Sequence, residues 1–373
     1  MADGTESRDW PSLARRLWDC LPAPVFAEGA AAALREAGCR RLLVACSGGA
    51  DSVCLLCALW AWPEDARPEM VVAHYNHRWR GAASEADAAF VAEMAAGLAL
   101  PFAGGERPDR EAAFTETEAR RLRQGFLRAT AEAYGCGVIA FGHQRDDILE
   151  TQLQRLARGA GSRGLAAPRP VHRFAGRPAH VRPLLHHPAG LLRSALRSTA
   201  VPWREDASNA DTGIPRNRIR RTVVPELEAA LSRDAGAGAA RSRALLEEDA
   251  EALDTLARDR FPAAFSGAEG LARAALAAAP RGLARRALSA WLAAHGLRES
   301  LGPRGMARLL DVVRGGGERA RLSVGSAFVV ADARTVALER IRERPEMPET
   351  PLELLPGEPL LLPSGGVLEA DWV

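Results

Sequence analysis

The chain has 373 residues, of which 47% are hydrophobic and 26% charged, as in globular proteins with two or three domains. No run of 18 apolar residues exists, which excludes a membrane-spanning helix, and the polar start of the chain predicts no secretory signal. The net charge of +2 excludes no class of partner, and several of the six cysteines lie in apolar runs, as buried, reduced thiols do. We therefore expect a cytoplasmic protein.

The first part of the chain predicts strands that alternate with helices. The predicted strands are 41–46, 70–74 and 138–142, and the predicted helices are 25–38, 53–60, 84–99 (with Ser84 as N-cap), 115–134 and 146–158. Short apolar strands separated by helices of this length indicate a parallel sheet with crossover helices on both faces. The predicted fold class is therefore α/β.

The pattern changes after residue 158. Residues 159–188 are rich in Gly, Pro and Arg and predict an extended loop, followed by a short helix at 191–199. Long helices are predicted at 228–258, 270–296 and 303–314, with strand-like runs at 320–323 and 327–338. We expect an α/β domain at 1–225, a mainly helical domain at 226–343, and a linker with a short terminal segment at 344–373.

The positive charge is concentrated in one segment. Residues 151–225 contain 14 Arg and 3 acidic residues, a net charge of +11, whereas the rest of the chain has a net charge of −9. Such a local field favours binding of nucleic acid or phosphate. A solvated surface with salt bridges is the alternative.

The sequence VACSGGADSVCLL at 44–56 combines a buried strand, a glycine-rich turn and a helix. Backbone N–H groups in such a turn, together with the helix dipole, make an anion site. Gly48 and Gly49 allow close approach of a phosphate, and Ser47 and Ser52 supply hydroxyl groups. Asp51 opposes an anion unless it holds a Mg²⁺ ion that bridges phosphates. The turn therefore predicts a nucleotide–metal site.

This turn resembles the PP-loop of the N-type ATP pyrophosphatases, and other motifs narrow the resemblance to the tRNA(Ile)-lysidine synthase family. Residues 74–80 (HYNHRWR) are similar to HxNHxxR, and residues 142–151 (GHQRDDILET) are similar to GHxxDDxxET. Residues 158–165, 205–209 and 216–220 resemble RGxGxxGL, EDxSN and RNxIR. Residues 119–124 resemble ARxxRY, with Gln124 in place of the usual Tyr, and Arg78 replaces a commonly small residue.

The resemblance implies a role for each matched position. Residues implied to bind ATP are Ser47, Gly48, Gly49, Ala50, Asp51, Ser52, Ala73, His74 and His143. Asp51 would also hold Mg²⁺, and Asp51, His143 and Asp147 would serve catalysis. Residues implied to bind lysine are Arg120, Arg123, Asp147 and Glu150. Residues implied to bind RNA are Arg158, Arg204, Asn209, Arg216, Asn217 and Arg220.

The resemblance also implies a reaction. The O2 atom of the cytidine at the first anticodon position of a CAU isoleucine tRNA attacks the α-phosphate of ATP, and pyrophosphate leaves. The ε-amine of free L-lysine then attacks C2, AMP leaves with O2, and lysidine is formed. The implied cofactors are ATP and Mg²⁺, and the implied partners are the tRNA and lysine. The resemblance also implies that the helical domain at 226–343 binds the tRNA, and homodimer formation stays open.

Residues taken singly leave alternatives. Asp147 and Glu150 share a helix face, where two acids can bind an amine or merely complement the helix dipole. His143 follows a strand, where it can act on substrate or cap a loop. Cys54 and Cys57 invite a cytidine thiolase with a metal cluster, although their apolar helix favours core thiols. A tRNA binder without catalysis is the second rival function.

Overall fold

The computed structural model describes residues 8–36, 40–63, 65, 67–107, 115–174, 176–205, 211–297, 300–315 and 319–340, together with the backbone of two short strands at 360–361 and 367–368. The chain divides into two compact units, Met1–Ala250 and Glu251–Val373. This division lies inside α11 (Ala235–Arg260). The expected functional boundary near residue 226, and the assignment of residues 344–373 as a linker and terminal segment, stay predictions.

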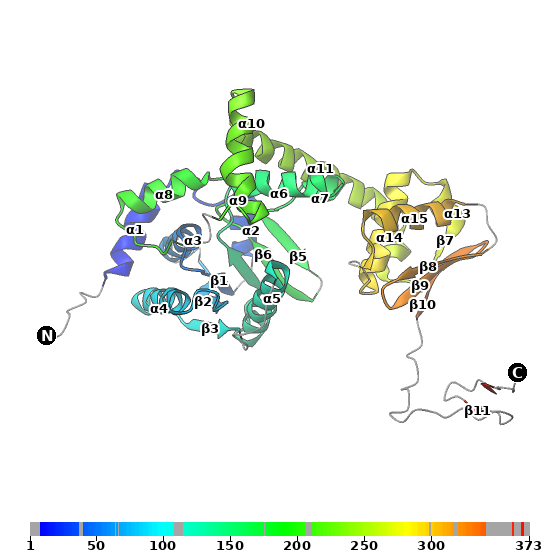
Figure 1. The fold of residues 1–373 in the computed structure, drawn as a ribbon, viewed down its shortest axis with the longest axis horizontal. Coiled ribbons are helices and arrows are strands. Elements are labelled where there is room, and N and C mark those ends of the chain that lie inside the picture. The colour runs from blue at the N-terminus through cyan, green and yellow to red at the C-terminus, as the bar shows by residue number, and fades with distance from the viewer. Residues whose placement is uncertain are drawn as a thin grey trace, which may run out of the picture. The chain divides into compact units, whose positions relative to one another are not determined.

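The first unit is built on a six-stranded sheet (Figure 1). Its strand order is β3-β2-β1-β4-β6-β5, and every neighbouring pair is parallel except the antiparallel pair of β5 and β6. The α/β fold class is thus confirmed. The strands are β1 (Arg41–Ala45), β2 (Glu69–Asn76), β3 (Phe102–Glu106), β4 (Val138–Phe141), β5 (Val171–Phe174) and β6 (Arg177–Val181).

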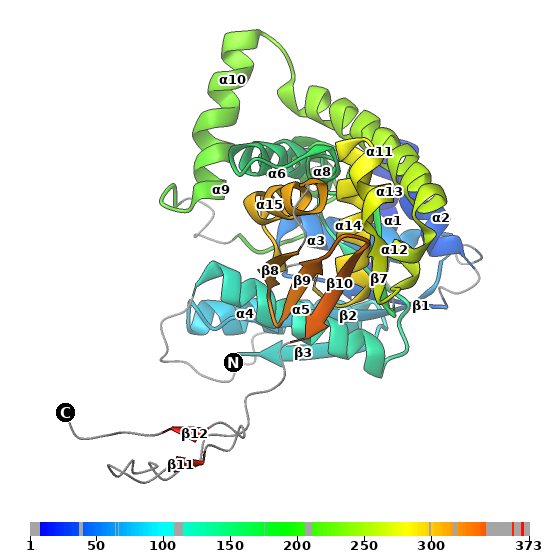
Figure 2. The ribbon, with the colours of Figure 1, turned by 90° about the vertical axis from the view of Figure 1, so that its right-hand side faces the viewer.

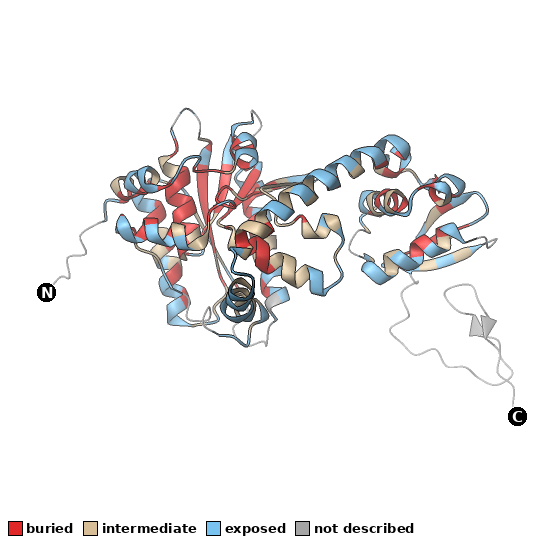
Figure 3. Cartoon of the chain, turned by 90° about the horizontal axis from the view of Figure 1, so that it is seen from above, coloured by how far each residue is buried: buried red, intermediate tan, exposed pale blue. Residues whose placement is uncertain are grey.

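Helices cover both faces of this sheet. One face packs into a large apolar core with α1 (Trp10–Cys20), α2 (Glu28–Arg35), α3 (Ala50–Ala61), α4 (Ala82–Gly97) and α8 (Ala189–Ser198). The other face packs on α5 (Glu116–Ala133) through a smaller cluster that includes Leu127 and Phe141. Burial is accordingly concentrated in the sheet and the helices packed on it (Figure 3).

The remaining helices of the first unit follow the fourth strand. They are α6 (Asp146–Ala157), α7 (Ser162–Leu165), α9 (Pro215–Arg218), a π-helix (Ile219–Val223), α10 (Val224–Leu231) and the start of α11. A small apolar cluster, which includes Ile148 and Ala239, packs α6 against α11. This packing brings the chain that follows α8 close to α6, which begins just after the carboxyl end of β4.

The second unit combines helices with a small antiparallel sheet of order β7-β10-β9-β8 (Figure 2). Its elements are α12 (Pro262–Ser266), β7 (Gly270–Ala272), α13 (Arg273–Ala278), α14 (Arg281–Ala294), α15 (Pro303–Arg314), β8 (Ala320–Val324), β9 (Ala327–Ala331) and β10 (Thr335–Arg340). The core is centred on the fully buried Trp291. Strands β11 (Leu360–Leu361) and β12 (Val367–Leu368) pair with each other. No helix among the described residues is both long and apolar enough to cross a membrane.

Several predicted elements were wrong in the first unit. The expected loop at 159–188 contains α7 and the hairpin of β5 and β6, whose short strands have few apolar residues and lie in a segment rich in Gly, Pro and Arg. Helix α4 begins at Ala82 with Gly81 as N-cap, and the Ser84 hydroxyl accepts a hydrogen bond from the backbone N–H of Arg80 instead. Helix α1 and strand β3 were missed.

Near the unit boundary and beyond it, the sequence analysis predicted single helices and strands where the structure has two elements. Ser232 adopts a left-handed conformation and ends α10, so 228–258 is not one helix. Pro280 has no N–H and separates α13 from α14 within 270–296. The run 327–338 is not one strand but parts of two, β9 and β10, joined by a turn. In this turn Asp332 accepts hydrogen bonds from the backbone N–H groups of Arg334 and Thr335.

Candidate active site

The glycine-rich turn lies between β1 and α3, as predicted. Gly48 has a φ of +86°, which favours glycine, and Gly49 is the N-cap of α3. The Ser52 hydroxyl accepts from the Ser47 N–H at 3.1 Å and donates to the Gly49 carbonyl at 2.9 Å. The two serines thus hold the turn in shape at a helix N-terminus, where backbone N–H groups bind anions.

A second loop touches this turn directly. A Cβ atom on Gly142 would lie 2.7 Å from the Asp51 carbonyl oxygen and 2.9 Å from the Ser52 nitrogen. Only glycine allows this approach of backbone to backbone. The residues after β4 are therefore positioned against the start of α3.

Asp51, in the first turn of α3, has a buried carboxylate oxygen, Oδ1, that the protein leaves without a hydrogen bond in its described part. Burial, and then the negative charge of Asp147, raise the pKa of Asp51 to about 6. A carboxylate held in this state fits a divalent cation, which would supply the missing partner and relieve the repulsion.

The predicted lysine-binding acids and two predicted RNA-binding arginines form one cluster. Asp147 and Glu150, on the first turns of α6, are buried, with only 6% and 1% of their surfaces exposed. Arg216 Nε donates to Glu150 Oε2 at 2.7 Å, and its terminal nitrogen donates to Asp147. Arg220 donates to both Glu150 oxygens and reaches Asp147 at 3.5 Å. We name these four residues the acid–arginine cluster.

The two arginines of this cluster lie in successive helical segments, Arg216 in α9 and Arg220 in the π-helix that follows it. Their spacing of four places them on one helical face, toward the acids. Their predicted role in RNA binding stays a prediction, as does the role of the acids in lysine binding.

His143 lies among arginines at the end of β4. Its Nδ1 atom is buried and has no hydrogen-bond partner in the described structure. Burial, and then the charges of Arg182 and Arg216, lower the pKa of His143 well below its ordinary value, so the imidazole is neutral at pH 7. The arrangement offers a neutral imidazole in a positive field, which suits an anionic ligand.

Arg120 and Arg123 lie on α5 near the same site. Burial, and then the charge of Arg120, lower the pKa of Arg123, and the buried Arg123 Nε has no partner among the described residues. Arg216 contributes a further repulsion. A negative ligand would relieve this repulsion between positive groups. The arrangement is therefore of the kind expected in a site that binds a carboxylate or a phosphate.

Arg182 belongs to the site and was missed by sequence reasoning. It follows β6, packs over the ring of Phe141 with 5.9 Å between its guanidinium carbon and the ring centroid, and donates to the Arg169 carbonyl. Burial, and then the charge of Arg120, lower its pKa to about 10. A cation directly after a parallel strand lies at the edge of the sheet where ligands bind. Arg182 could have been identified in this way only if strand β6 had been predicted.

The predicted adenine-binding positions lie at the end of β2. Ala73 and His74 are buried, and His74 Nδ1 is 2.9 Å from the Cys46 carbonyl oxygen, which links β2 to the start of the turn. Burial is the main cause that lowers the pKa of His74. Their contact with adenine stays a prediction.

The other predicted RNA-binding residues are distributed around the site. Arg204 pairs with Asp87 at 2.8 Å, and its backbone N–H donates to the Gly48 carbonyl, so it borders the turn. Arg158 is exposed at the end of α6. Asn217 donates to the Asp211 carbonyl. Asn209 lies outside the described residues.

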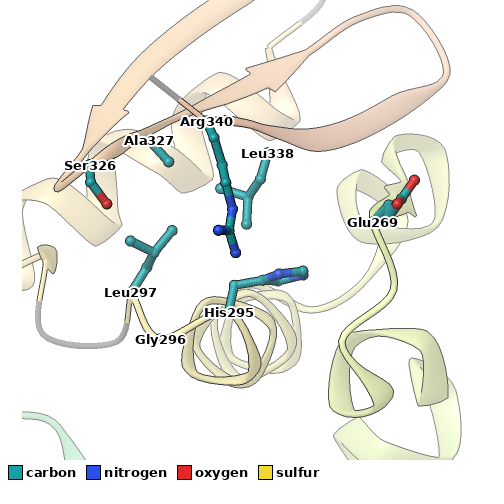
Figure 4. A pocket seen from close by; sticks show the side chains of 8 residues that line it. All are labelled: Glu269, His295, Gly296, Leu297, Ser326, Ala327, Leu338 and Arg340. Atoms are coloured by element: carbon teal, nitrogen blue, oxygen red, sulfur yellow. The ribbon is translucent and has the colours of Figure 1, made fainter. Parts of the chain in front are cut away.

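The second unit contains a cavity of about 450 Å³ that includes none of these residues. The side chains of Arg340 and His295 point into it from opposite sides (Figure 4). It is lined by Glu269, His295, Gly296, Leu297, Ser326, Ala327, Leu338 and Arg340.

Comparisons with known proteins agree with this geometry. Residues 22–227, more than half of the chain, match the family described as the PP-loop domain. The tRNA(Ile)-lysidine synthase of Solibacter usitatus is 43% identical over 46% of this chain and 37% of its own length. That of Rhodopirellula baltica is 37% identical over 46% of this chain and 48% of its own. That of Ralstonia nicotianae is 37% identical over 72% and 58%. The chain thus spans less than two thirds of each of these relatives.

Proposed function

This chain belongs to the PP-loop domain family, and on that premise we propose that it uses ATP to join L-lysine to a cytidine of tRNA, with lysidine as the product. The proposed RNA substrate is an isoleucine tRNA with a CAU anticodon, modified at its first anticodon position. The similar proteins named tRNA(Ile)-lysidine synthase support this choice of reaction within the family.

One observation carries the proposal: residues predicted to bind ATP lie close to a residue predicted to bind lysine. The Gly142 backbone abuts the backbone of Asp51 and Ser52, and Asp147 raises the pKa of Asp51 through its charge. ATP would activate O2 of the cytidine and lysine would then attack the adjacent C2 atom, so the two sites must lie close together.

The turn at residues 47–52 would bind the phosphates of ATP. Backbone N–H groups at the start of α3 would contact phosphate oxygens, and Gly48 leaves room for their approach. Asp51, with its unpartnered oxygen, would hold Mg²⁺, which neutralises charge on the departing pyrophosphate. Ala73 and His74 are proposed to border the adenine ring.

The cytidine O2 atom would attack the α-phosphate, with release of pyrophosphate. Negative charge develops on the phosphoryl oxygens in this step, and Arg123, Arg182 and the neutral His143 lie in the site with unpartnered buried nitrogens. Donors fixed in place before the reaction stabilise such charge without reorganisation. We assign this role to them, with Arg120 and Arg123 also binding the lysine carboxylate.

Asp147 and Glu150 would bind the amino group of lysine and accept its proton as it attacks C2. Both acids are paired with Arg216 and Arg220 in this structure. A lysine ammonium therefore enters only if part of the acid–arginine cluster rearranges. RNA phosphates, which attract arginine strongly, are the natural partners for the released guanidinium groups.

Two other functions are less well supported. A thiolase needs reactive or metal-bound cysteines, but Cys54 and Cys57 are fully buried in α3, and burial raises the pKa of both thiols far above the ordinary value. A tRNA binder without catalysis has no need of a buried carboxylate oxygen on Asp51 that lacks a hydrogen bond.

The test is AMP formation with each substrate left out in turn. The protein, ATP and Mg²⁺ should release AMP when CAU isoleucine tRNA and lysine are both present, and much less when the tRNA is absent. Asp51→Ala should abolish release in the complete mixture. AMP released equally without tRNA would contradict an RNA substrate, and no AMP from folded protein would contradict the catalytic assignment.

A further inference from the structure

Aromatic rings continue from the active site across the sheet to its edge. The rings belong to His143 and Phe141 at the end of β4, to His180 on β6, and to Phe174 and His172 on β5. We name this set the aromatic stripe. Neither the glycine-rich turn nor the acid–arginine cluster includes its three outer members.

Strand pairing places the stripe on one face. His172 pairs with His180 across β5 and β6, and His180 pairs with Ile139 across β6 and β4. Val171 and Val181 alternate with these residues and pack into the core on the opposite face. The stripe therefore shares the face of α5, where Phe141 and Ile139 belong to the apolar cluster.

The rings are in continuous contact. Centroid distances are 5.8 Å from His143 to Phe141, 4.8 Å from Phe141 to His180, 4.8 Å from His180 to Phe174, and 4.4 Å from Phe174 to His172. The last pair is stacked, with 11° between the ring planes. These separations are those of interacting aromatic pairs.

The two phenylalanines of the stripe differ in exposure. Phe141 is only 7% exposed, whereas Phe174, on the outermost strand, is 37% exposed. A phenylalanine that merely filled the core would not be placed on the outermost strand with more than a third of its surface in solvent. The outer end of the stripe therefore presents an aromatic ring to solution, and the inner end meets the site at His143.

The arginine residues around the stripe indicate which kind of partner it binds. No Asp or Glu occurs from residue 151 to residue 204, while Arg177 pairs with Phe174 across the hairpin and Arg182 packs on Phe141. Aromatic rings bordered by arginine are the composition of surfaces that bind single-stranded nucleic acid, because bases stack on the rings and phosphates pair with the cations. An apolar protein partner would not require the positive charge.

We propose that the aromatic stripe stacks unpaired nucleobases of the RNA substrate next to the modified cytidine and so directs that cytidine toward His143. This proposal rests on the proposed function for the identity of the RNA. Phe174 provides the exposed stacking face, and the stripe leads inward from it.

Binding of an anticodon stem-loop tests the stripe apart from catalysis. The RNA carries the CAU anticodon with 2-aminopurine in place of its adenine, so that stacking on the protein lowers the fluorescence. Phe174→Leu keeps an apolar side chain but removes the ring, and Phe174→Trp keeps a ring. Tyr134→Leu is the matched control, because Tyr134 is 36% exposed at the end of α5 and lies outside the stripe.

We expect Phe174→Leu to weaken binding by about fivefold or more and to leave the bound RNA brighter than wild type does. Phe174→Trp and Tyr134→Leu should bind as the wild type does. Phe174→Leu with wild-type affinity and wild-type quenching would overturn the proposal, as would equal weakening by Tyr134→Leu. Melting temperatures of all variants, measured in parallel, identify a loss that comes from misfolding, and Phe174→Trp then decides the question.

Lysine transfer by the wild type, measured on the full tRNA, separates this proposal from the function. If the wild type transfers lysine but Phe174→Leu does not change RNA binding, the stripe proposal alone fails. Ring-dependent binding without transfer means that the stripe proposal holds and the lysidine assignment fails. Absence of RNA binding by the wild type overturns both.

Discussion

Replacing Glu150 by Gln should release the segment that follows residue 214 from the body of the first unit. Glu150 is 1% exposed and accepts from both Arg216 and Arg220. Breaking a buried ion pair from one side costs about 3–5 kcal/mol, because a charge is left buried without compensation. The two arginine side chains are 34% and 35% exposed, so solvent screens part of this loss. We therefore expect a cost of about 2–3 kcal/mol.

Hydrogen exchange of the backbone amides in 215–223 measures this cost locally. Because every 1.4 kcal/mol changes an equilibrium tenfold, the amides should exchange about 30- to 150-fold faster in Glu150→Gln than in the wild type. Glu226→Gln, an exposed acid in the first turn of α10, is the control and should change exchange less than about threefold. Unchanged protection in Glu150→Gln would refute the inference that the acid–arginine cluster fixes this segment.

Three further outcomes follow from the geometry of the site. Gly142→Ala should weaken ATP binding by about tenfold or more, because its Cβ would collide with the backbone of Asp51, whereas Gly190→Ala, with open space around it, should bind ATP normally in calorimetry. Asp51→Asn should remove the Mg²⁺ dependence of ATP binding, and an unchanged dependence would contradict the assigned metal ligand. Burial, and then the charges of Arg182, His172 and Arg120, lower the pKa of His180 to about 4. Below about pH 6.5, therefore, His180 is protonated in the unfolded chain but stays neutral in the folded chain. The stability of the wild type should therefore fall between pH 7 and pH 5, and His180→Phe should lose less in urea denaturation over that range; an equal loss would contradict the assigned cause.

The sequence predicted the parts of the fold that local patterns determine. The strand before Cys46 and the helix after Gly49 follow from an apolar run, a glycine-rich turn and a second apolar run, and all three lie where expected. His143 was expected directly after a strand, and it follows β4 at the carboxyl end of a parallel strand, the edge of a sheet where ligands bind.

Contacts between distant segments were not predictable in the same way. The link between Glu150 and Arg220 spans 70 residues, and no local pattern distinguishes an arginine that turns toward a buried acid from one that faces RNA. The hairpin of β5 and β6 was missed because Gly, Pro and Arg dominate its segment, and Arg182 was missed with it. Tertiary pairing with β4 compensates for the weak strand propensity of this segment.

Transfer of labelled lysine tests the central claim most directly. The protein is incubated with ATP, Mg²⁺, radiolabelled L-lysine and an unmodified isoleucine tRNA with a CAU anticodon, and the label in the RNA is counted. The account predicts incorporation into this tRNA, none with Asp51→Ala, and little into a methionine tRNA with the same anticodon. AMP formation without label in the RNA would contradict the lysidine assignment, because it would show that the activated cytidine reacts with a different nucleophile.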